Sequence, residues 1–292
     1  MNMKDYKIGI IGLGNMGSRM AIRLINNGFH LNVYNRSGIV NTEIEPSSIN
    51  IYLSAEELAN YSDIIIMMVT DDSAVKEIIF DEKGVYNSQF SGILLNTSTI
   101  SPNLSLSLNN DLKKIGIKYV DAPVLGSLSA AENGKLKFLI KLNDVMFNKI
   151  HSVIKLLGSD YRIIKFSKTA QEIKLFHNTF CAMVLGLLSK TLLASMEYSS
   201  ERNEVYDALS FGALNCDLLA AKQSMFSGMN FEPLFPLKLM FKDLDTLKHE
   251  IDSMNISTSF IDDIHQQYKD AIPEYGDYDC ASIFKYYFDK NE

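Results

Sequence analysis

The stretch that most constrains the fold is KIGIIGLGNMGSRM, close to the N-terminus. Residues 7–12 form a short apolar run, and residues 16–28 have the apolar spacing of a helix that stops at a glycine. Between them, GLGNMG matches the pattern G-x-G-x-x-G where a strand gives way to a helix. In this setting the pattern is typical of a dinucleotide-binding βαβ unit.

Each glycine of the motif has a geometric role. Gly12 allows a tight turn, Gly14 lets the backbone approach a pyrophosphate, and Gly17 allows the helix to pack closely on the strand. The amide groups at the start of the helix would face the phosphates. The predicted cofactor-binding turn therefore consists of Gly12, Leu13, Gly14, Asn15, Met16 and Gly17.

The end of the second predicted strand indicates which dinucleotide binds. NAD-binding chains usually carry an acid there for the ribose hydroxyls, whereas this chain has Asn35, Arg36 and Ser37. A planar guanidinium suits a 2′-phosphate. We therefore predict NADP(H) in preference to NAD(H), with these three residues as cofactor contacts. If Arg36 is only an exposed turn residue, either dinucleotide would bind.

The first half of the chain alternates between strand and helix patterns. The strands are expected at 30–35, 63–69, 92–96, 117–123 and 135–140, and the helices between them include 54–61 and 101–116. This alternation predicts an α/β fold, a doubly wound and mostly parallel sheet with helices on both faces. Ligands bind such sheets at the carboxyl ends of the strands. The candidates there are Val69, Thr70, Ser98 and Thr99.

The pattern changes near residue 168. Roughly thirty residues contain no proline and one glycine, which predicts a helix about 45 Å long. No strand pattern recurs after it, and further helices are expected at 202–214, 216–227, 235–254, 257–270 and 279–289. We predict a dinucleotide-binding domain over 1–165 and an all-helical domain over 166–292. The apolar face of the long helix needs cover from other helices or a second chain.

The bulk properties exclude several classes of function. The net charge of −7 argues against a nucleic-acid partner. Three scattered cysteines have no metal-binding spacing and suit a reducing compartment. The N-terminus lacks the form of a signal peptide, and the longest later apolar run is broken by Lys190, too early for a membrane span. We expect a soluble cytoplasmic protein without a resident metal.

Two features later in the chain have both a functional and a structural reading. Lys174 and Asn178 lie four residues apart and so share one face of the long helix. Alone, they read as a solvated lysine and a surface asparagine. The loop DAPVLGSLSAAENGKL follows a strand, and its amide groups around Gly126 and Ser127 suit a carboxylate. A structural turn fits that loop equally well.

Together, the motifs resemble those of the β-hydroxyacid dehydrogenase family. GLGNMGSRMA, STISP, DAPVLGS, the Lys174–Asn178 pair and FKDL (241–244) occur in that family's order and spacing, over nearly the whole chain. The family includes 3-hydroxyisobutyrate dehydrogenases and glyoxylate/succinic semialdehyde reductases. The resemblance implies a Rossmann domain, a long interdomain helix and a helical domain that dimerises, so a homodimer or a dimer-based tetramer is expected.

The resemblance also assigns roles to residues. It makes Lys174 the catalytic general acid and base, and Asn178 the residue that positions the lysine and the substrate. The substrate carboxylate is expected at the loop that follows DAP, and Lys242 near the cofactor and active site. The full expected substrate-binding set is Ser98, Leu125, Gly126, Ser127, Lys174 and Asn178.

Within the family, the NRS turn and the GS ending of the substrate loop look like the NADPH-dependent semialdehyde and glyoxylate reductases. The expected reaction is reduction of a small carboxylate-bearing aldehyde or oxo acid. Leu125 stands where the family often has serine, and Lys168 and Ala170 stand where it usually has glycines. The alternatives are an NAD(P)-dependent 3-hydroxyisobutyrate-type dehydrogenase, an imine reductase, which generally lacks the lysine, and a non-catalytic binding module.

Overall fold

The computed structural model describes residues 6–38, 43–142, 144–198, 201–212, 214–252 and 257–291. It divides into two compact units, Met1–Lys174 and Leu175–Glu292. The division falls inside one continuous helix, α7 (Ala170–Glu197). The predicted boundary after residue 165 lies earlier, between the last strand of the first unit and this helix.

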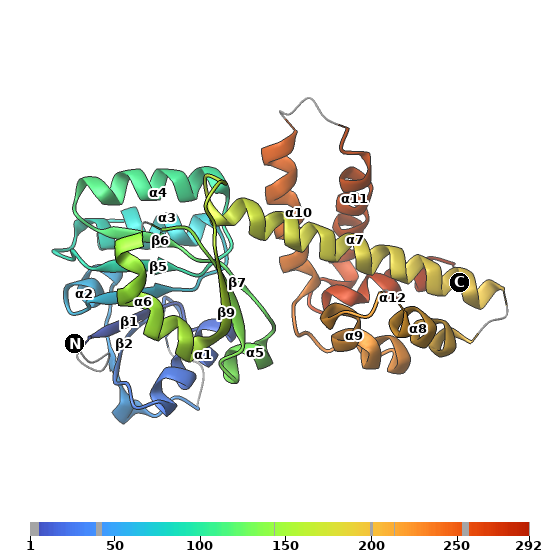
Figure 1. The fold of residues 1–292 in the computed structure, drawn as a ribbon, viewed down its shortest axis with the longest axis horizontal. Helices are drawn as coiled ribbons and strands as arrows, with labels where there is room; N and C mark the ends of the chain where they lie inside the picture. Colours follow the sequence, from blue (N-terminus) through green and yellow to red (C-terminus); the bar gives the residue numbers. More distant parts are fainter. Residues whose placement is uncertain are drawn as a thin grey trace. The chain divides into compact units, whose positions relative to one another are not determined.

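The first unit is built on a six-stranded parallel sheet with the order β3-β2-β1-β4-β5-β6 (Figure 1). The chain leaves β1 on one side to form β2 and β3, and then crosses to β4 on the other side of β1. The carboxyl ends of β1 and β4 therefore flank the switch point at which open α/β sheets bind ligands. The strands are β1 (Ile8–Ile11), β2 (Leu31–Tyr34), β3 (Ile49–Ile51), β4 (Ile64–Met67), β5 (Ile93–Asn96) and β6 (Lys118–Asp121).

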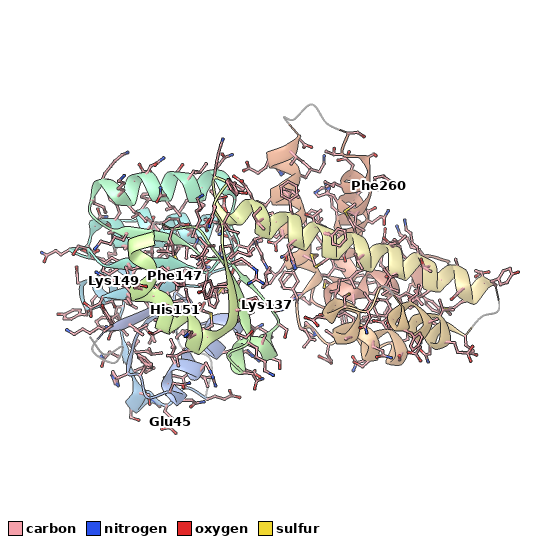
Figure 2. The ribbon with its side chains drawn as sticks, viewed as in Figure 1. Glu45, Lys137, Phe147, Lys149, His151 and Phe260 are labelled. Atoms are coloured by element: carbon pink, nitrogen blue, oxygen red, sulfur yellow. The ribbon has the colours of Figure 1, made fainter. Side chains whose placement is uncertain are left out.

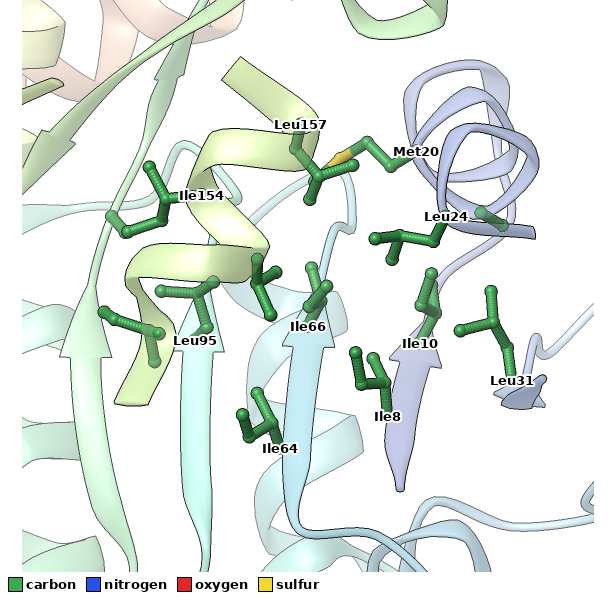
Figure 3. Close-up of a cluster of buried hydrophobic side chains, with 14 of the residues drawn as sticks. Ile8, Ile10, Met20, Leu24, Leu31, Ile64, Ile66, Leu95, Ile154 and Leu157 are labelled. Atoms are coloured by element: carbon green, nitrogen blue, oxygen red, sulfur yellow. The ribbon is translucent and has the colours of Figure 1, made fainter. Parts of the chain in front are cut away.

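Helices cover both faces of this sheet, as predicted. One face carries Ile8, Ile10 and Ile66, which pack against α1 (Asn15–Asn26) and α6 (Asp144–Leu157) (Figure 3). The alternate strand residues, such as Ile65, form the core of the other face. Because side chains alternate along a strand, burial of both faces makes the strands apolar throughout. The helices on the second face are α2 (Ala55–Asn60), α3 (Asp72–Phe80) and α4 (Pro102–Lys114).

A separate three-stranded sheet follows, with the order β7-β8-β9. Its strands are β7 (Val124–Leu125), β8 (Leu136–Ile140) and β9 (Gly158–Ile163), and α5 (Leu128–Glu132) lies between the first two. β7 is antiparallel to β8, and β9 is parallel to it. The predicted strand 135–140 thus belongs to a second sheet. A tilted aromatic contact joins α6 to β9, with the ring centres of Phe147 and Tyr161 4.9 Å apart (Figure 2 labels Phe147 and its neighbour His151).

The second unit is helical. After α7 come α8 (Arg202–Phe211), α9 (Asp217–Gly228), α10 (Leu237–Ile251), α11 (Ser259–Tyr275) and α12 (Ile283–Asn291). Short 3₁₀ turns occur in the chain at Pro46–Ser48, Val85–Asn87 and Cys280–Ser282. The predicted helices correspond to these elements, although residues 213 and 253–254 at two predicted ends lie outside the described residues.

Among the described residues, α7 is the one helix long and apolar enough to cross a membrane by length and composition. The helix is longer than the uninterrupted apolar run that ends at Lys190, from which no membrane span is predicted. Ala182, Leu185 and Leu192 of α7 are completely buried in the core of the second unit. Such burial is the ordinary reason for an apolar helix in a globular fold.

Candidate functional site

The glycine-rich turn has the geometry that the sequence predicts. Gly12 follows β1 with a φ of +93°, and a Cβ there would lie 2.2 Å from the carbonyl oxygen of Met68. A Cβ on Gly17 would lie 2.0 Å from the carbonyl oxygen of Gly12. Both distances are far below van der Waals contact, so only glycine fits these two positions without displacing the backbone.

The start of α1 is open to a ligand. Gly14 is the N-cap residue, no side chain caps the helix, and no atom lies within 4 Å of where a Cβ would be. Asn15 is exposed, Met16 is half-buried, and the first turn carries no acid. The amide groups of this turn and the positive end of the helix dipole therefore suit an anionic phosphate.

The NRS turn divides into a structural and an exposed part. The Asn35 side chain accepts a hydrogen bond from the backbone N–H of Leu13 at 2.9 Å and donates to the carbonyl of Gly38. Asn35 thus holds the glycine-rich turn against the end of β2. Arg36 and Ser37 are exposed. The Arg36 guanidinium forms an ion pair with Glu77 of α3, with an N–O distance of 2.7 Å.

The ends of β4 and β5 are cross-linked by Ser98. Its hydroxyl accepts from the backbone N–H of Val69 at 2.9 Å and donates to the carbonyl of Met67 at 3.3 Å, and the residue is completely buried. This placement does not favour the predicted contact between the Ser98 side chain and substrate. Thr70 is exposed and Thr99 is partly exposed at the same edge of the sheet.

The substrate loop predicted from the resemblance is partly exposed. Leu125 ends β7 and is half-buried, and Gly126 is exposed with a φ of +139°, which favours glycine. The Ser127 hydroxyl accepts from the backbone N–H of Ala130 and so caps α5. The hydroxyl of Ser127 therefore has a structural partner, while the backbone of the turn lies at the surface.

Two buried residues that sequence reasoning did not select hold the start of α7. The Asp121 carboxylate, at the end of β6, accepts from the backbone N–H of Ala170 at 2.7 Å. The Gln171 side chain donates to that carboxylate at 2.7 Å. The sequence signals were the acid of DAP and the glutamine three residues before Lys174, but neither residue type by itself indicates such a contact.

Asp121 predicts a specific pH dependence. Burial raises the pKa of this carboxyl from 3.8 to about 6, although hydrogen bonds from Gln171, Ala170 and Ser105 oppose the rise. The folded state then binds the proton more tightly than the unfolded state. The contribution of Asp121 to the free energy of unfolding is therefore greatest below pH 3.8 and declines as the pH rises to about 6.

The expected loss is roughly 3 kcal/mol in the free energy of unfolding. Tyr119, which also faces this carboxyl, has its pKa raised well above the ordinary value and so stays neutral in this range. Urea unfolding of the wild type and Asp121→Asn across that range measures the effect. The wild type should lose stability relative to the variant as the pH rises, and a constant difference would contradict the assignment.

On α7, Lys174 and Asn178 are both buried, with 8% and 6% of their surface exposed. They lie one turn apart and share a face of the helix. This burial removes the ordinary explanation of a solvated lysine and a surface asparagine. A buried lysine ammonium is uncommon without a function or a partner.

Asn178 belongs to a polar cluster in the helical unit. Its Nδ2 donates to the carboxylate of Asp243 at 2.6 Å, and its Oδ1 lies 3.1 Å from Nδ1 of His177. Lys242 forms an ion pair with the other oxygen of Asp243 at 3.0 Å. Sequence reasoning selected Lys242 and Asn178, and the structure adds Asp243, which is 2% exposed and connects them.

Two family models match the chain, one over each of its two parts. The model of the NAD-binding domain of 6-phosphogluconate dehydrogenase matches residues 7–170. The model described as the NAD-binding domain of NADP-dependent 3-hydroxyisobutyrate dehydrogenase matches residues 169–287. The two matches meet where α7 begins.

Individual relatives cover most of the chain. It is 27% identical to 2-hydroxy-3-oxopropionate reductase of Escherichia coli, covering 82% of each protein. It is 26% identical to glyoxylate/succinic semialdehyde reductase 1 of Arabidopsis thaliana, covering 82% of this chain and 83% of the relative. A 3-hydroxyisobutyrate dehydrogenase structure from Mycobacterium tuberculosis with L-serine superposes with a TM-score of 0.83 at 18% identity, covering 96% and 98% of the two chains.

The predicted family, fold class and use of a nicotinamide cofactor are thereby confirmed. The domain matches span nearly all of the described residues, and the two relatives and the solved structure named above are dehydrogenases and reductases. The chain belongs to the β-hydroxyacid dehydrogenase family of NAD(P)-dependent oxidoreductases.

Proposed function

We propose that this protein uses NADPH to reduce a small aldehyde or oxo acid that carries a carboxylate, of the glyoxylate or succinic semialdehyde type. The observation that carries the proposal is the burial of Lys174 one helical turn from Asn178. An aldehyde oxygen that gains a hydride on its carbon needs a proton, and a positioned ammonium group supplies one. Bound nicotinamide would supply the hydride.

The residues of this chain divide the remaining work. Lys174 protonates the carbonyl oxygen as negative charge develops on it, and accepts that proton in the reverse direction. Asn178 is held by Asp243 and offers an amide to the substrate without adding charge. The exposed backbone at Gly126 is the candidate contact for the carboxylate. Lys242 stays a predicted contact of the cofactor.

The preference for NADPH rests on Arg36. It is 72% exposed at its side chain, follows β2 and has no acid in the positions beside it that would bind ribose hydroxyls. Its ion pair with Glu77 is also largely exposed, so it is worth at most about 1 kcal/mol. A 2′-phosphate can therefore replace Glu77 as the partner of the guanidinium.

Arg36→Ala is expected to weaken NADPH binding roughly tenfold to a hundredfold and to change NADH binding little, because charge-assisted hydrogen bonds contribute about 1.5–3 kcal/mol. Glu77→Gln should tighten NADPH binding by up to about fivefold, since it removes a competing carboxylate. Titration of nucleotide fluorescence with each variant measures both effects. Equal losses for NADPH and NADH in Arg36→Ala would refute the role of Arg36.

A substrate panel tests the reaction. Consumption of NADPH is followed with glyoxylate, succinic semialdehyde, methylglyoxal, methylmalonate semialdehyde and a cyclic imine, with NADH in parallel. We expect turnover with an aldehyde acid and NADPH. Turnover only of the imine, or turnover only of methylmalonate semialdehyde with NADH, would replace the proposal by one of the related activities. Leu125 then becomes the first position to vary, because it lines the loop expected to select the substrate.

We further propose that the protein works in the cytoplasm as a homodimer or a dimer-based tetramer. Cys181, Cys216 and Cys280 are not in disulfide bonds in the part of the chain that the structure describes, which suits a reducing compartment. Along α7, Phe180 and Leu187 are 68% and 71% exposed and lie two turns apart on one face of the helix. Exposed apolar faces of this kind mark association sites, and sedimentation of the purified chain tests this one.

A further inference from the structure

The first turn of α7 is held by hydrogen bonds from residues close to it in sequence and from a residue far from it in sequence. A helix leaves its first amide groups without partners inside the helix. Here the Thr169 hydroxyl accepts from the backbone N–H of Glu172 at 3.3 Å, which is a local cap. The Asp121 carboxylate accepts hydrogen bonds from the two backbone N–H groups before Glu172, those of Ala170 at 2.7 Å and Gln171 at 3.3 Å. This second cap comes from the end of β6, far away in sequence.

The Gln171 side chain makes a second connection, to the loop after β5. Its Nε2 donates to Asp121 Oδ1 at 2.7 Å and to the carbonyl of Ser98 at 3.1 Å. Its Oε1 accepts from the backbone N–H of Ile100 at 3.1 Å. Gln171 is completely buried, and both of its amide hydrogens and its oxygen have partners. One side chain thus joins the end of β6, the loop after β5 and the first turn of α7.

These contacts fix two segments that the reaction needs. Lys174 lies three residues after Gln171, so it follows within one helical turn and moves with that turn. The loop segment bound by Gln171 contains Thr99, a predicted cofactor contact. All of these residues lie within the first unit, Met1–Lys174. The local cap by Thr169 is enough to start a helix, whereas the bonds to Asp121 and Ser98 also set where the helix starts.

We propose that Asp121 and Gln171 are positioning residues, which fix Lys174 relative to the cofactor-side loop after β5. The proposal rests on the proposed function for the role of Lys174. Neither residue needs to touch the substrate. They act by keeping the distance between the first turn of α7 and the loop after β5 fixed. A misplacement of about 1 Å between reacting groups costs on the order of a hundredfold in rate.

The test replaces Gln171 by methionine, which keeps the length of the side chain and removes its three side-chain hydrogen bonds. Asn32→Leu is the matched control. Asn32 is also a buried amide of the first unit, 5% exposed, and its Nδ2 donates to the carbonyl of Tyr61 at 2.7 Å. It lies on β2, and the partners of its side chain, Tyr61, Ser62 and Asn50, all lie outside α7. Asp121→Asn is the second test variant. If one of the two variants fails to fold, the other still tests the proposal.

Two readouts need no substrate. The first is amide hydrogen exchange of residues 169–178, which should be roughly fivefold faster or more in Gln171→Met and unchanged in Asn32→Leu. The second is the rate at which a small anhydride acylates Lys174 across a pH series, followed by mass spectrometry. We expect a displaced pH profile in Gln171→Met and Asp121→Asn, and the wild-type profile in Asn32→Leu.

Where a substrate turns over, kcat should fall roughly tenfold to a hundredfold in Gln171→Met with little change in the KM for NADPH. A profile of Lys174 acylation that matches the wild type in both test variants would overturn the proposal. The same result in the control as in the test variants would overturn it too. Absence of turnover in the wild type would count against the proposed function alone, because exchange and acylation still decide the positioning role.

Discussion

Replacement of Lys174 by alanine is expected to lower kcat roughly a hundredfold to ten-thousandfold, the range that positioned acid–base catalysis contributes. The variant removes the proton donor and leaves the glycine-rich turn and Arg36 in place, so NADPH should still bind. Because the lost interaction acts on the transition state, kcat and kcat/KM should fall together. Steady-state kinetics on the substrate that the panel identifies, with nucleotide binding measured in the same samples, checks both statements.

The matched control is Lys190→Ala. Lys190 lies on the same helix, and its ammonium nitrogen is 5.1 Å from the centre of the Tyr287 ring in the helical unit. Both variants remove one lysine from α7, so a general effect of charge or helix stability would appear in each. We expect near wild-type kcat in Lys190→Ala. If Lys174→Ala keeps more than about a tenth of the wild-type kcat, Lys174 is not the general acid.

The parts of the fold that the sequence predicts are those with local causes. The glycine-rich turn is recognisable because Gly12 and Gly17 occupy positions where a side chain would strike the backbone. The central strands are recognisable because helices on both faces make every position apolar. The long helix follows from roughly thirty residues without proline. Each of these signals lies within one short segment.

The second sheet has a weaker local signal. β9 has the sequence GSDYRI, in which Ser159 and Asp160 are exposed, and the helix α6 separates it in sequence from its partner β8. The helix α6 packs beside α1 on the face of the first sheet (Figure 3). This arrangement follows from tertiary contacts, which outweigh intrinsic strand preference. The sequence of residues 158–163 therefore does not by itself predict a strand.

The candidate site shows the same limit. The spacing of Lys174 and Asn178 places them on one face of a helix, which is a local property, whereas their predicted roles come from the resemblance to the family. Ser98, Asp121 and Asp243 take their roles from partners distant in sequence, and only the structure supplies these. From the sequence alone, a serine after a strand can be a ligand contact or a cross-link between two loops. In the structure Ser98 is completely buried and bonded to Met67 and Val69, as a cross-link requires, and its contact with substrate stays a prediction.

Loss of Asp279 is expected to have the largest effect on stability in the helical unit. Its carboxylate is completely buried and forms an ion pair with Lys222 of α9, with an N–O distance of 2.6 Å. It also accepts from the backbone N–H groups of Leu234, Phe235 and Ala281, each at 3.0 Å. The Asp279 side chain thereby accepts hydrogen bonds from backbone N–H groups in the segments before α10 and α12, and it also neutralises the buried ammonium group of Lys222.

Asp279→Ala leaves the Lys222 charge buried without its partner, together with three amide groups. Breaking a buried pair in this way costs about 3–5 kcal/mol. Lys222→Met is the informative comparison, because it removes the buried cation, fills a similar volume and leaves Asp279 bonded to the three amides. Its cost should be clearly smaller. Urea unfolding of both variants, followed by circular dichroism, measures the two losses. Equal losses would mean that the ion pair itself is the dominant interaction, and a loss below about 1 kcal/mol in Asp279→Ala would refute the role of Asp279 as the central polar residue of this unit.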